Sequence, residues 1–104
     1  MKKAFTYLWE FKVSPERQTE FEQHYGPKGA WARLFHKSPD YLGTSLLKDD
    51  AVLGRYITID RWRSKESFLS FRTVFAAQYA QLDNEFEQLT DYESLVGEFN
   101  DLSL

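Results

Sequence analysis

Two stretches in which apolar and polar residues alternate constrain the fold of this chain more than any other feature. AFTYLWEFKV, residues 4–13, places five apolar side chains on one face, namely Phe5, Tyr7, Trp9, Phe11 and Val13. RYITIDRW, residues 55–62, alternates again, with Tyr56, Thr58, Asp60 and Trp62 on one face and Arg55, Ile57, Ile59 and Arg61 on the other. A period of two with aromatic and β-branched residues predicts a β-strand in each stretch.

A helix is expected after the first strand. Ser14 is a candidate N-cap and Pro15 suits the first helical position. Phe21 and Tyr25 then lie four residues apart on one helical face.

The stretch HYGPKGAWARLFHK, residues 24–37, keeps apolar residues at helical spacing although Pro27 lies between two glycines. Proline removes a backbone donor and clashes with the preceding turn, so the helix must end or kink there. We therefore expect two helical pieces at an angle. The break would let Trp31 and Phe35 swing away from the sheet and leave room for a small ligand. The alternative is a bend that only fits a twisted sheet.

The second half of the chain predicts three more elements. YLGTSLLKDD, residues 41–50, is strand-like, and a turn with Gly54 joins it to the strand at 55–62 as a hairpin. Ser64 is expected to cap a second helix, whose apolar stripe runs at three- and four-residue steps from Phe68 to Leu89. An unbroken helix of this length would extend beyond the ends of the strands it packs on. We therefore expect it to break near residues 82–84. Residues 92–99 form the last predicted strand.

The element order is strand, helix, strand, strand, helix, strand. This order predicts one α+β domain over residues 1–104, with the ferredoxin-like βαββαβ arrangement. Its four-stranded antiparallel sheet would carry both helices on one face. Leu8, Ile57, Ile59, Leu95 or their neighbours would partly line the open face, and a homodimer through that face would cover them. In such a barrel dimer both faces are buried, so alternation alone leaves the direction of Trp62 open.

Composition narrows the class of protein. Nine Phe, six Tyr and three Trp make up 17% of 104 residues, which indicates an aromatic-lined cavity, an interface or an aromatic core. The net charge of −3 comes without a basic stripe, so we expect no nucleic-acid partner. The sequence has no cysteine and no apolar run of membrane-spanning length, and we expect no membrane partner and a cytoplasmic location.

Several stretches together resemble the antibiotic biosynthesis monooxygenase superfamily. These are YLWEFKVSPE, HYGPKGAWARLF, YLGTSLL, GRYITIDRWRS and YESLVGEF, with the strand that ends in Trp62, the cap at Ser64 and Phe68 one turn later as the most diagnostic piece. The resemblance implies small ferredoxin-like domains that pair as dimeric α/β barrels. It implies the reaction less well, because members include cofactor-independent oxygenases of polyphenolic polyketides, haem-degrading oxygenases, quinol-modifying enzymes and proteins without a known activity.

The haem-degrading branch of this superfamily uses an Asn on the first strand, a Trp at the end of the third and a haem-ligating His on the second helix. Trp62 fits the Trp, but Trp9 stands at the Asn position and Tyr79, or Gln81 under another alignment, at the His position. Because haem iron needs a side-chain ligand, the resemblance does not favour haem. His24 and His36 also lack the spacing of a metal site. We expect neither cofactor nor metal.

What remains is a cofactor-free pocket for a small aromatic ligand, polyphenolic or quinol-like. Such a site needs an apolar slot, a group that takes the phenolic proton, and a donor where negative charge develops. The candidates for the slot are Tyr7, Trp9, Tyr25, Trp31, Phe35, Tyr56, Phe71 and Phe75. The candidates for catalysis are Trp62, Asp60, His36 and Tyr79, with Asp60 as a base whose pKa burial would raise. Arg55 or Arg72 could hold an anion.

Each of these assignments has an alternative. The aromatic side chains could form only a core, and Asp60 could pair with Arg61 or Arg63 or cap the next turn. The function also has two readings: a cofactor-independent monooxygenase, or a non-catalytic domain of the same fold that binds a small ligand or dimerises. A buried titratable group in the pocket is what would favour the enzyme.

Overall fold

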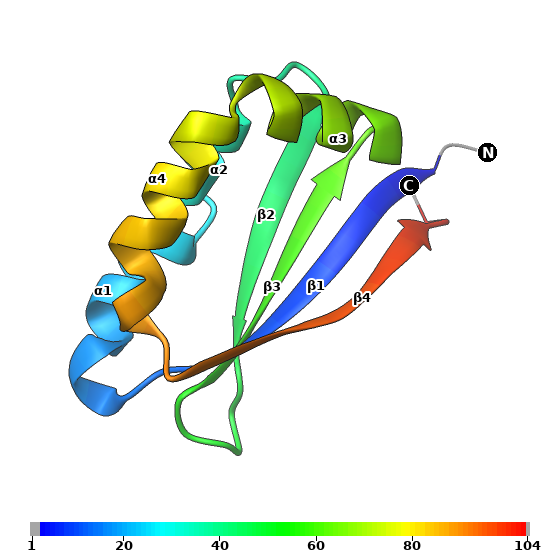
Figure 1. Cartoon of the computed structure of the whole chain (residues 1–104). Helices are drawn as coiled ribbons and strands as arrows, with labels where there is room; N and C mark the ends of the chain where they lie inside the picture. The colour runs from blue at the N-terminus through cyan, green and yellow to red at the C-terminus, as the bar shows by residue number, and fades with distance from the viewer. Residues whose placement is uncertain (1–2, 104) are drawn as a thin grey trace.

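The computed structural model describes residues 3–103 and has the expected order of elements (Figure 1). The four strands are β1 (Ala4–Lys12), β2 (Tyr41–Lys48), β3 (Arg55–Trp62) and β4 (Tyr92–Asp101). The helices are α1 (Gln18–Tyr25), α2 (Ala30–Phe35), α3 (Lys65–Val74) and α4 (Ala76–Phe86), with the 3-10 turns η1 (Pro15–Arg17) and η2 (Glu87–Leu89). The ferredoxin-like α+β prediction is thus confirmed.

The strands form one antiparallel sheet in the order β2-β3-β1-β4, and the helices all lie on one of its faces (Figure 1). Cross-strand partners share a face, and the pairs Phe5 with Trp62 and Tyr7 with Asp60 therefore point the same way. Trp62 is fully buried at 0% exposure, so this face is the one beneath the helices. The direction of Trp62, which alternation left open, is fixed by this register.

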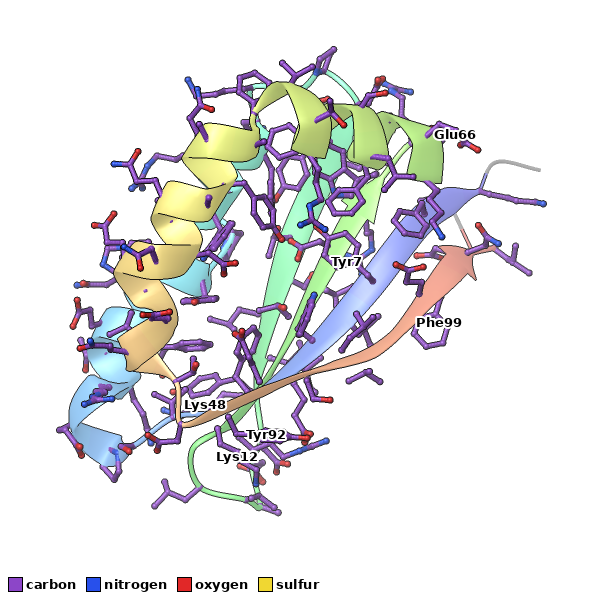
Figure 2. The ribbon with its side chains drawn as sticks, viewed as in Figure 1. Tyr7, Lys12, Lys48, Glu66, Tyr92 and Phe99 are labelled. Atoms are coloured by element: carbon purple, nitrogen blue, oxygen red, sulfur yellow. The ribbon has the colours of Figure 1, made fainter. Side chains whose placement is uncertain are left out.

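The opposite face of the sheet carries no helix. Ile57 and Ile59 are only half-buried there, and Leu47, the cross-strand partner of Ile57, is 49% exposed. Phe99 also lies on the side of the sheet away from the helices (Figure 2), because its partner on β1 is Thr6. Leu95 differs from its prediction. A register shift at β4 pairs it with Trp9, whose alternation faces the helices, and not with the open-face row.

The break in the first helix is confirmed. α1 ends at Tyr25, α2 starts at Ala30, and the N–H of Gly29 donates to the carbonyl of Gly26 at 2.9 Å to close the turn between them. A Cβ on Gly29 would lie 2.4 Å from the carbonyl oxygen of His24, a distance that no side chain tolerates. Only glycine lets the chain pass this close to the end of α1.

Both expected helix caps can be compared with the structure. Ser64 accepts a hydrogen bond from the N–H of Ser67 at 3.1 Å, and the Ser67 hydroxyl accepts one from the N–H of Ser64, which makes a capping box. Ser14 makes no cap hydrogen bond to the helix. Its hydroxyl donates to Asp91 instead, because the segment after it begins as a 3-10 turn.

The long second helix breaks at Phe75, not near residues 82–84. The backbone of Phe75, at φ −106° and ψ 29°, leaves the helical region between α3 and α4. The bend lets α3 press Phe68 and Phe71 onto Trp62 while α4 runs beside α1 and α2 (Figure 1). Neither glycine nor proline marks the position, and packing against the sheet decides it.

Two aromatic clusters fill the space between sheet and helices. One surrounds Trp62 under α2 and α3, and the other surrounds Phe21 and Tyr56 under α1. Within residues 3–103, no helix combines the length and the apolar character that crossing a membrane requires.

Candidate active site

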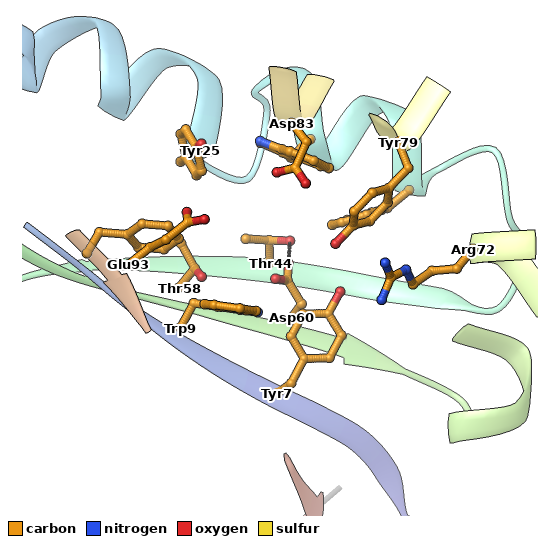
Figure 3. Close-up of a pocket in the computed structure, with 13 residues that line it drawn as sticks. Tyr7, Trp9, Tyr25, Thr44, Thr58, Asp60, Arg72, Tyr79, Asp83 and Glu93 are labelled. Atoms are coloured by element: carbon orange, nitrogen blue, oxygen red, sulfur yellow. Dashed lines mark hydrogen bonds between the residues drawn. The ribbon is translucent and has the colours of Figure 1, made fainter. Parts of the chain in front are cut away.

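A pocket of about 280 Å³ opens between the sheet and the helices, where the two aromatic clusters meet (Figure 3). Side chains of β1, β2, β3, β4 and of α1 to α4 all contribute to it. Its walls are formed by Tyr7, Trp9, Phe11, Tyr25, Trp31, Phe35, Thr44, Thr58, Asp60, Arg72, Tyr79, Asp83 and Glu93. Most of these are aromatic, and the polar ones converge on the interior from several elements, as in small-molecule sites.

Asp60 is the buried acid of the pocket, with 7% of its surface exposed. Its Oδ1 accepts a hydrogen bond from the Thr44 hydroxyl, which in turn contacts the hydroxyl of Tyr41. Burial raises the pKa of Asp60 from 3.8 to about 6, because desolvation disfavours the carboxylate more than Thr44 and Arg61 favour it. A carboxylate with such a pKa is suited to accept a proton near neutral pH.

Tyr7 faces Asp60 from the neighbouring strand, and its hydroxyl points into the pocket (Figure 3). The Nε1–H of Trp62 donates to this hydroxyl at 3.3 Å and occupies one of its lone pairs. Since an indole only donates, the O–H of Tyr7 remains to be donated elsewhere. Burial, and after it the charge of Asp60, raises the pKa of Tyr7 well above its usual value and keeps the phenol protonated.

Tyr79 and Arg72 form the wall contributed by α3 and α4. The guanidinium of Arg72 lies 4.6 Å from the centroid of the Tyr79 ring, a stacking distance. Burial raises the pKa of Tyr79, and the Arg72 charge opposes that shift. Tyr79 therefore presents a second protonated hydroxyl beside a cation.

Two further carboxylates line the pocket: Glu93 lies toward the other end with Tyr25, and Asp83 lies over the middle (Figure 3). Burial and then the Asp83 charge raise the pKa of Glu93. Burial likewise raises the pKa of Tyr25, and the nearby indole of Trp31 opposes that shift. The Nε1–H of Trp31 is itself buried without a hydrogen-bond acceptor of normal geometry among the described residues.

The structure brings most of the predicted site residues together. Seven of them line the pocket: Tyr7, Trp9, Tyr25, Trp31, Phe35, Asp60 and Tyr79. Arg72, one of the two arginines considered for an anion, lines it as well. The observed cavity lies beside the helix break and Trp31, but Phe35 does not swing away from the sheet as expected, because it is 4% exposed and packs against Tyr41 and Trp62.

Five predicted site residues lie outside the lining. Trp62 and Phe71 are buried behind it in the core, and Phe75 packs against that core beside Phe71. Tyr56 is buried in the second cluster and donates its hydroxyl to Glu22 at 2.5 Å.

His36 is the fifth. It is exposed as the C-cap of α2, with its ring nearly perpendicular to that of Tyr41 at 4.7 Å between centroids. The second arginine considered for an anion, Arg55, pairs with Glu10 and Asp49.

Sequence reasoning missed four polar residues of the lining. Thr58 shares the alternating face of Asp60, and Asp83 follows Tyr79 by one helical turn, so both had a detectable signal. Thr44 and Glu93 had none, because their places depend on the registers of β2 and β4, which are shifted at residues 41–43 and near Leu95. Within residues 3–103, His, Asp and Glu side chains nowhere gather in threes as a metal ion would need.

The fold and the pocket define a small ferredoxin-like α+β domain with an aromatic cavity that holds one buried acid. A family model for antibiotic biosynthesis monooxygenases matches residues 4–81. The chain belongs to this family. No curated protein matches the chain.

Solved structures with the same fold include a variant of SnoaB, a cofactor-independent oxygenase from Streptomyces nogalater. The sequence identity is 16% and the TM-score 0.72, over 100% of this chain and 97% of that chain. The chain is also similar to PA3566 from Pseudomonas aeruginosa, with 13% identity and a TM-score of 0.68 over 99% of this chain and 98% of the other. At such identities the likeness supports the fold and leaves the substrate open.

Proposed function

We propose that this protein is a cofactor-independent monooxygenase of a small phenolic aromatic, polyphenolic or quinol-like, with Asp60 as the general base. One observation carries the proposal: the buried carboxylate of Asp60 lies in an aromatic pocket with a pKa raised to about 6. A base of this strength takes a phenolic proton far better than an exposed aspartate does.

The chemistry needs no reductant if the substrate supplies the electrons. Removal of a proton from the phenol, or from its keto tautomer, gives an electron-rich anion that O₂ can oxidise. When the reacting ring carbon carries two hydrogens, one oxygen atom forms a new carbonyl group on it. The other oxygen leaves as water with both hydrogens, so that R₂CH₂ and O₂ give R₂CO and H₂O.

The remaining groups of the pocket serve binding and charge stabilisation in this proposal. Trp9 and Trp31 flank the flat ring and, with Phe35, exclude water. The hydroxyls of Tyr7 and Tyr79 donate to oxygen atoms on which negative charge develops. Trp62 does not line the pocket and acts as a positioning residue, because its Nε1–H fixes the direction of the Tyr7 hydroxyl.

Oxygen uptake with a panel of phenols, quinols and anthrones tests the proposal. We compare the wild type with Asp60→Asn, which keeps the size and the acceptor for Thr44 but removes the base. Asp50→Asn, at an exposed aspartate outside the pocket, is the matched control. Uptake should fall about 100-fold or more in Asp60→Asn and stay unchanged in Asp50→Asn. Equal uptake by Asp60→Asn would refute Asp60 as the base.

We also propose that two copies pair through the open face of the sheet. This proposal is supported by the apolar row of Ile57, Ile59, Leu47 and Phe99, half-buried or exposed in the single chain. Ion pairs border the row at both ends, Arg55 with Asp49 at 2.9 Å and Arg61 with Asp101 at 3.7 Å. An apolar centre with a charged rim is typical of protein interfaces.

The second function is a non-catalytic domain that binds the same class of ligand. The pocket supports binding independently of the base, because its walls are mainly aromatic. Binding of a panel member by the wild type without any oxygen uptake would favour this function over the enzyme.

A further inference from the structure

Arg72 has no ion-pair partner among residues 3–103, although it lies in the wall of the pocket. Its guanidinium is held over two rings, 4.6 Å from the centroid of Tyr79 and 5.9 Å from that of Phe68. A guanidinium stacked in this way keeps its edge free for hydrogen bonds in the plane. The two contacts therefore fix the cation without neutralising it.

The charge of Arg72 is also not cancelled by the buried acid of the site. Arg72 favours the phenolate of Tyr79, and Asp60 forms no ion pair with Arg72. Arg72 thus acts on the end of the pocket where Tyr79 lies, and Asp60 is not its counter-ion.

The opposite end of the pocket is acidic. Glu93 lies there with Tyr25, and Asp83 lies over the middle of the pocket, whereas Arg72 lies beside the hydroxyl ends of Tyr79 and Tyr7 (Figure 3). Neither Asp83 nor Glu93 has an ion-pair partner within the described chain. Arg72 at one end of the cavity and Glu93 at the other therefore carry opposite charges without an ion-pair partner among residues 3–103, on side chains that are exposed to solvent.

We propose that the pocket selects an aromatic acid and binds it in one orientation, with its carboxylate on Arg72, at the end of the pocket away from Glu93. This inference rests on the proposed function for the reacting ring, and adds an anionic substituent that the preferred substrate carries. Arg72 supplies charge-assisted hydrogen bonds to the carboxylate. Glu93 and Asp83 repel the same carboxylate, so that the reversed orientation is disfavoured.

Three probes that differ only in charge or in one substituent test this selection. They are 6-hydroxy-2-naphthoate, its neutral methyl ester and 2-naphthol, titrated by calorimetry without oxygen. Wild-type protein should bind the acid about tenfold more tightly than the ester, a modest factor because Arg72 is exposed to solvent. The difference should shrink as salt is added.

Variants of two arginines separate the charge from the packing. Arg72→Met keeps the long apolar stem over Tyr79 and should bind acid and ester equally. Arg72→Lys should keep part of the preference. Arg63→Gln, at an exposed arginine outside the pocket, should leave it unchanged. Glu93→Gln should bind the acid more tightly than the wild type does.

The inference is overturned if wild-type protein binds acid and ester alike, binds none of the probes, or keeps its preference in Arg72→Met. Because these titrations exclude oxygen, they are independent of turnover. A preference for the acid without oxygen uptake would refute the enzyme and keep the anion site. Oxygen uptake with neutral phenols alone would keep the enzyme and refute the anion site.

Discussion

The indole Nε1–H of Trp62 donates to the hydroxyl of Tyr7 at 3.3 Å, across the helix-covered face of the sheet. Among residues 3–103, Trp62 is the largest fully buried side chain, whereas Tyr7 reaches the pocket. This bond links the packing of the core to the direction of a hydroxyl in the site. In the proposed site the tryptophan therefore acts through Tyr7 and does not line the pocket itself.

Replacing Trp62 with Phe removes the donor and leaves unfilled volume. We expect the free energy of unfolding to fall by about 1–3 kcal/mol, measured by denaturant titration. Tyr7→Phe removes the acceptor, and the double variant completes a thermodynamic cycle. The coupling between the two positions should be about 0.5–1.5 kcal/mol. Strictly additive losses would mean that the bond contributes nothing.

Stability should depend on pH through Asp60. Its pKa is raised from 3.8 to about 6 in the folded protein, so between about pH 4 and 6 the folded state holds a proton that the unfolded chain has lost. The free energy of unfolding therefore falls as pH rises through this window and is level above it. A pKa shift of this size corresponds to a change of about 3 kcal/mol in the free energy of unfolding.

The comparison with Asp60→Asn isolates this effect, because the other titrating groups are common to both proteins. The variant should gain about 2–3 kcal/mol relative to the wild type between pH 4 and pH 7, measured by urea unfolding at each pH. A constant difference between the two proteins across this range would show that Asp60 titrates normally.

The break between α1 and α2 depends on Gly29. Gly29→Ala places a Cβ 2.4 Å from the carbonyl oxygen of His24 and forces the two helices apart. We expect a loss of about 1–3 kcal/mol, and weaker binding of aromatic probes because Trp31 moves with α2. Gly26→Ala is the milder control, since its nearest atom would be at 3.0 Å. Equal losses in both variants would contradict the special place of Gly29.

Pairing through the open sheet face predicts a dimer that one charge can split. Ile59→Glu places a carboxylate in the centre of the apolar row and should give a folded monomer, observed by native mass spectrometry and light scattering. Leu53→Glu, at a hairpin residue that is 79% exposed, is the matched control and should stay dimeric. A wild-type monomer would refute the interface.

Local sequence patterns are sufficient to predict the order of the strands and helices in this fold. The alternation of residues 55–62 gave β3 with both its bounds, and Pro27 with its two glycines gave the break between α1 and α2. These signals succeed because a period of two and a missing backbone donor act within a few residues. The bend at Phe75 has no such signal, since contacts of Phe68 and Phe71 with Trp62 impose it.

The residues of the site also divide into those that local patterns predict and those that they do not. Tyr7 and Asp60 follow from alternation along single strands, and their pairing follows from the antiparallel order. Thr44 and Glu93 depend on shifted registers, which single-sequence patterns do not reveal. His36 is a candidate for its chemistry alone, and its position as the C-cap of a six-residue helix leaves it facing solvent.

The most direct test of the central proposal is a single turnover of anthrone with ¹⁸O₂, followed by mass spectrometry of the product. Anthrone carries two hydrogens on the carbon that would be oxidised. After subtraction of the uncatalysed reaction, we predict one ¹⁸O atom per anthraquinone formed by wild-type protein, and a rate about 100-fold lower for Asp60→Asn. A wild-type rate no higher than the uncatalysed one, or product oxygen derived from water, would contradict it.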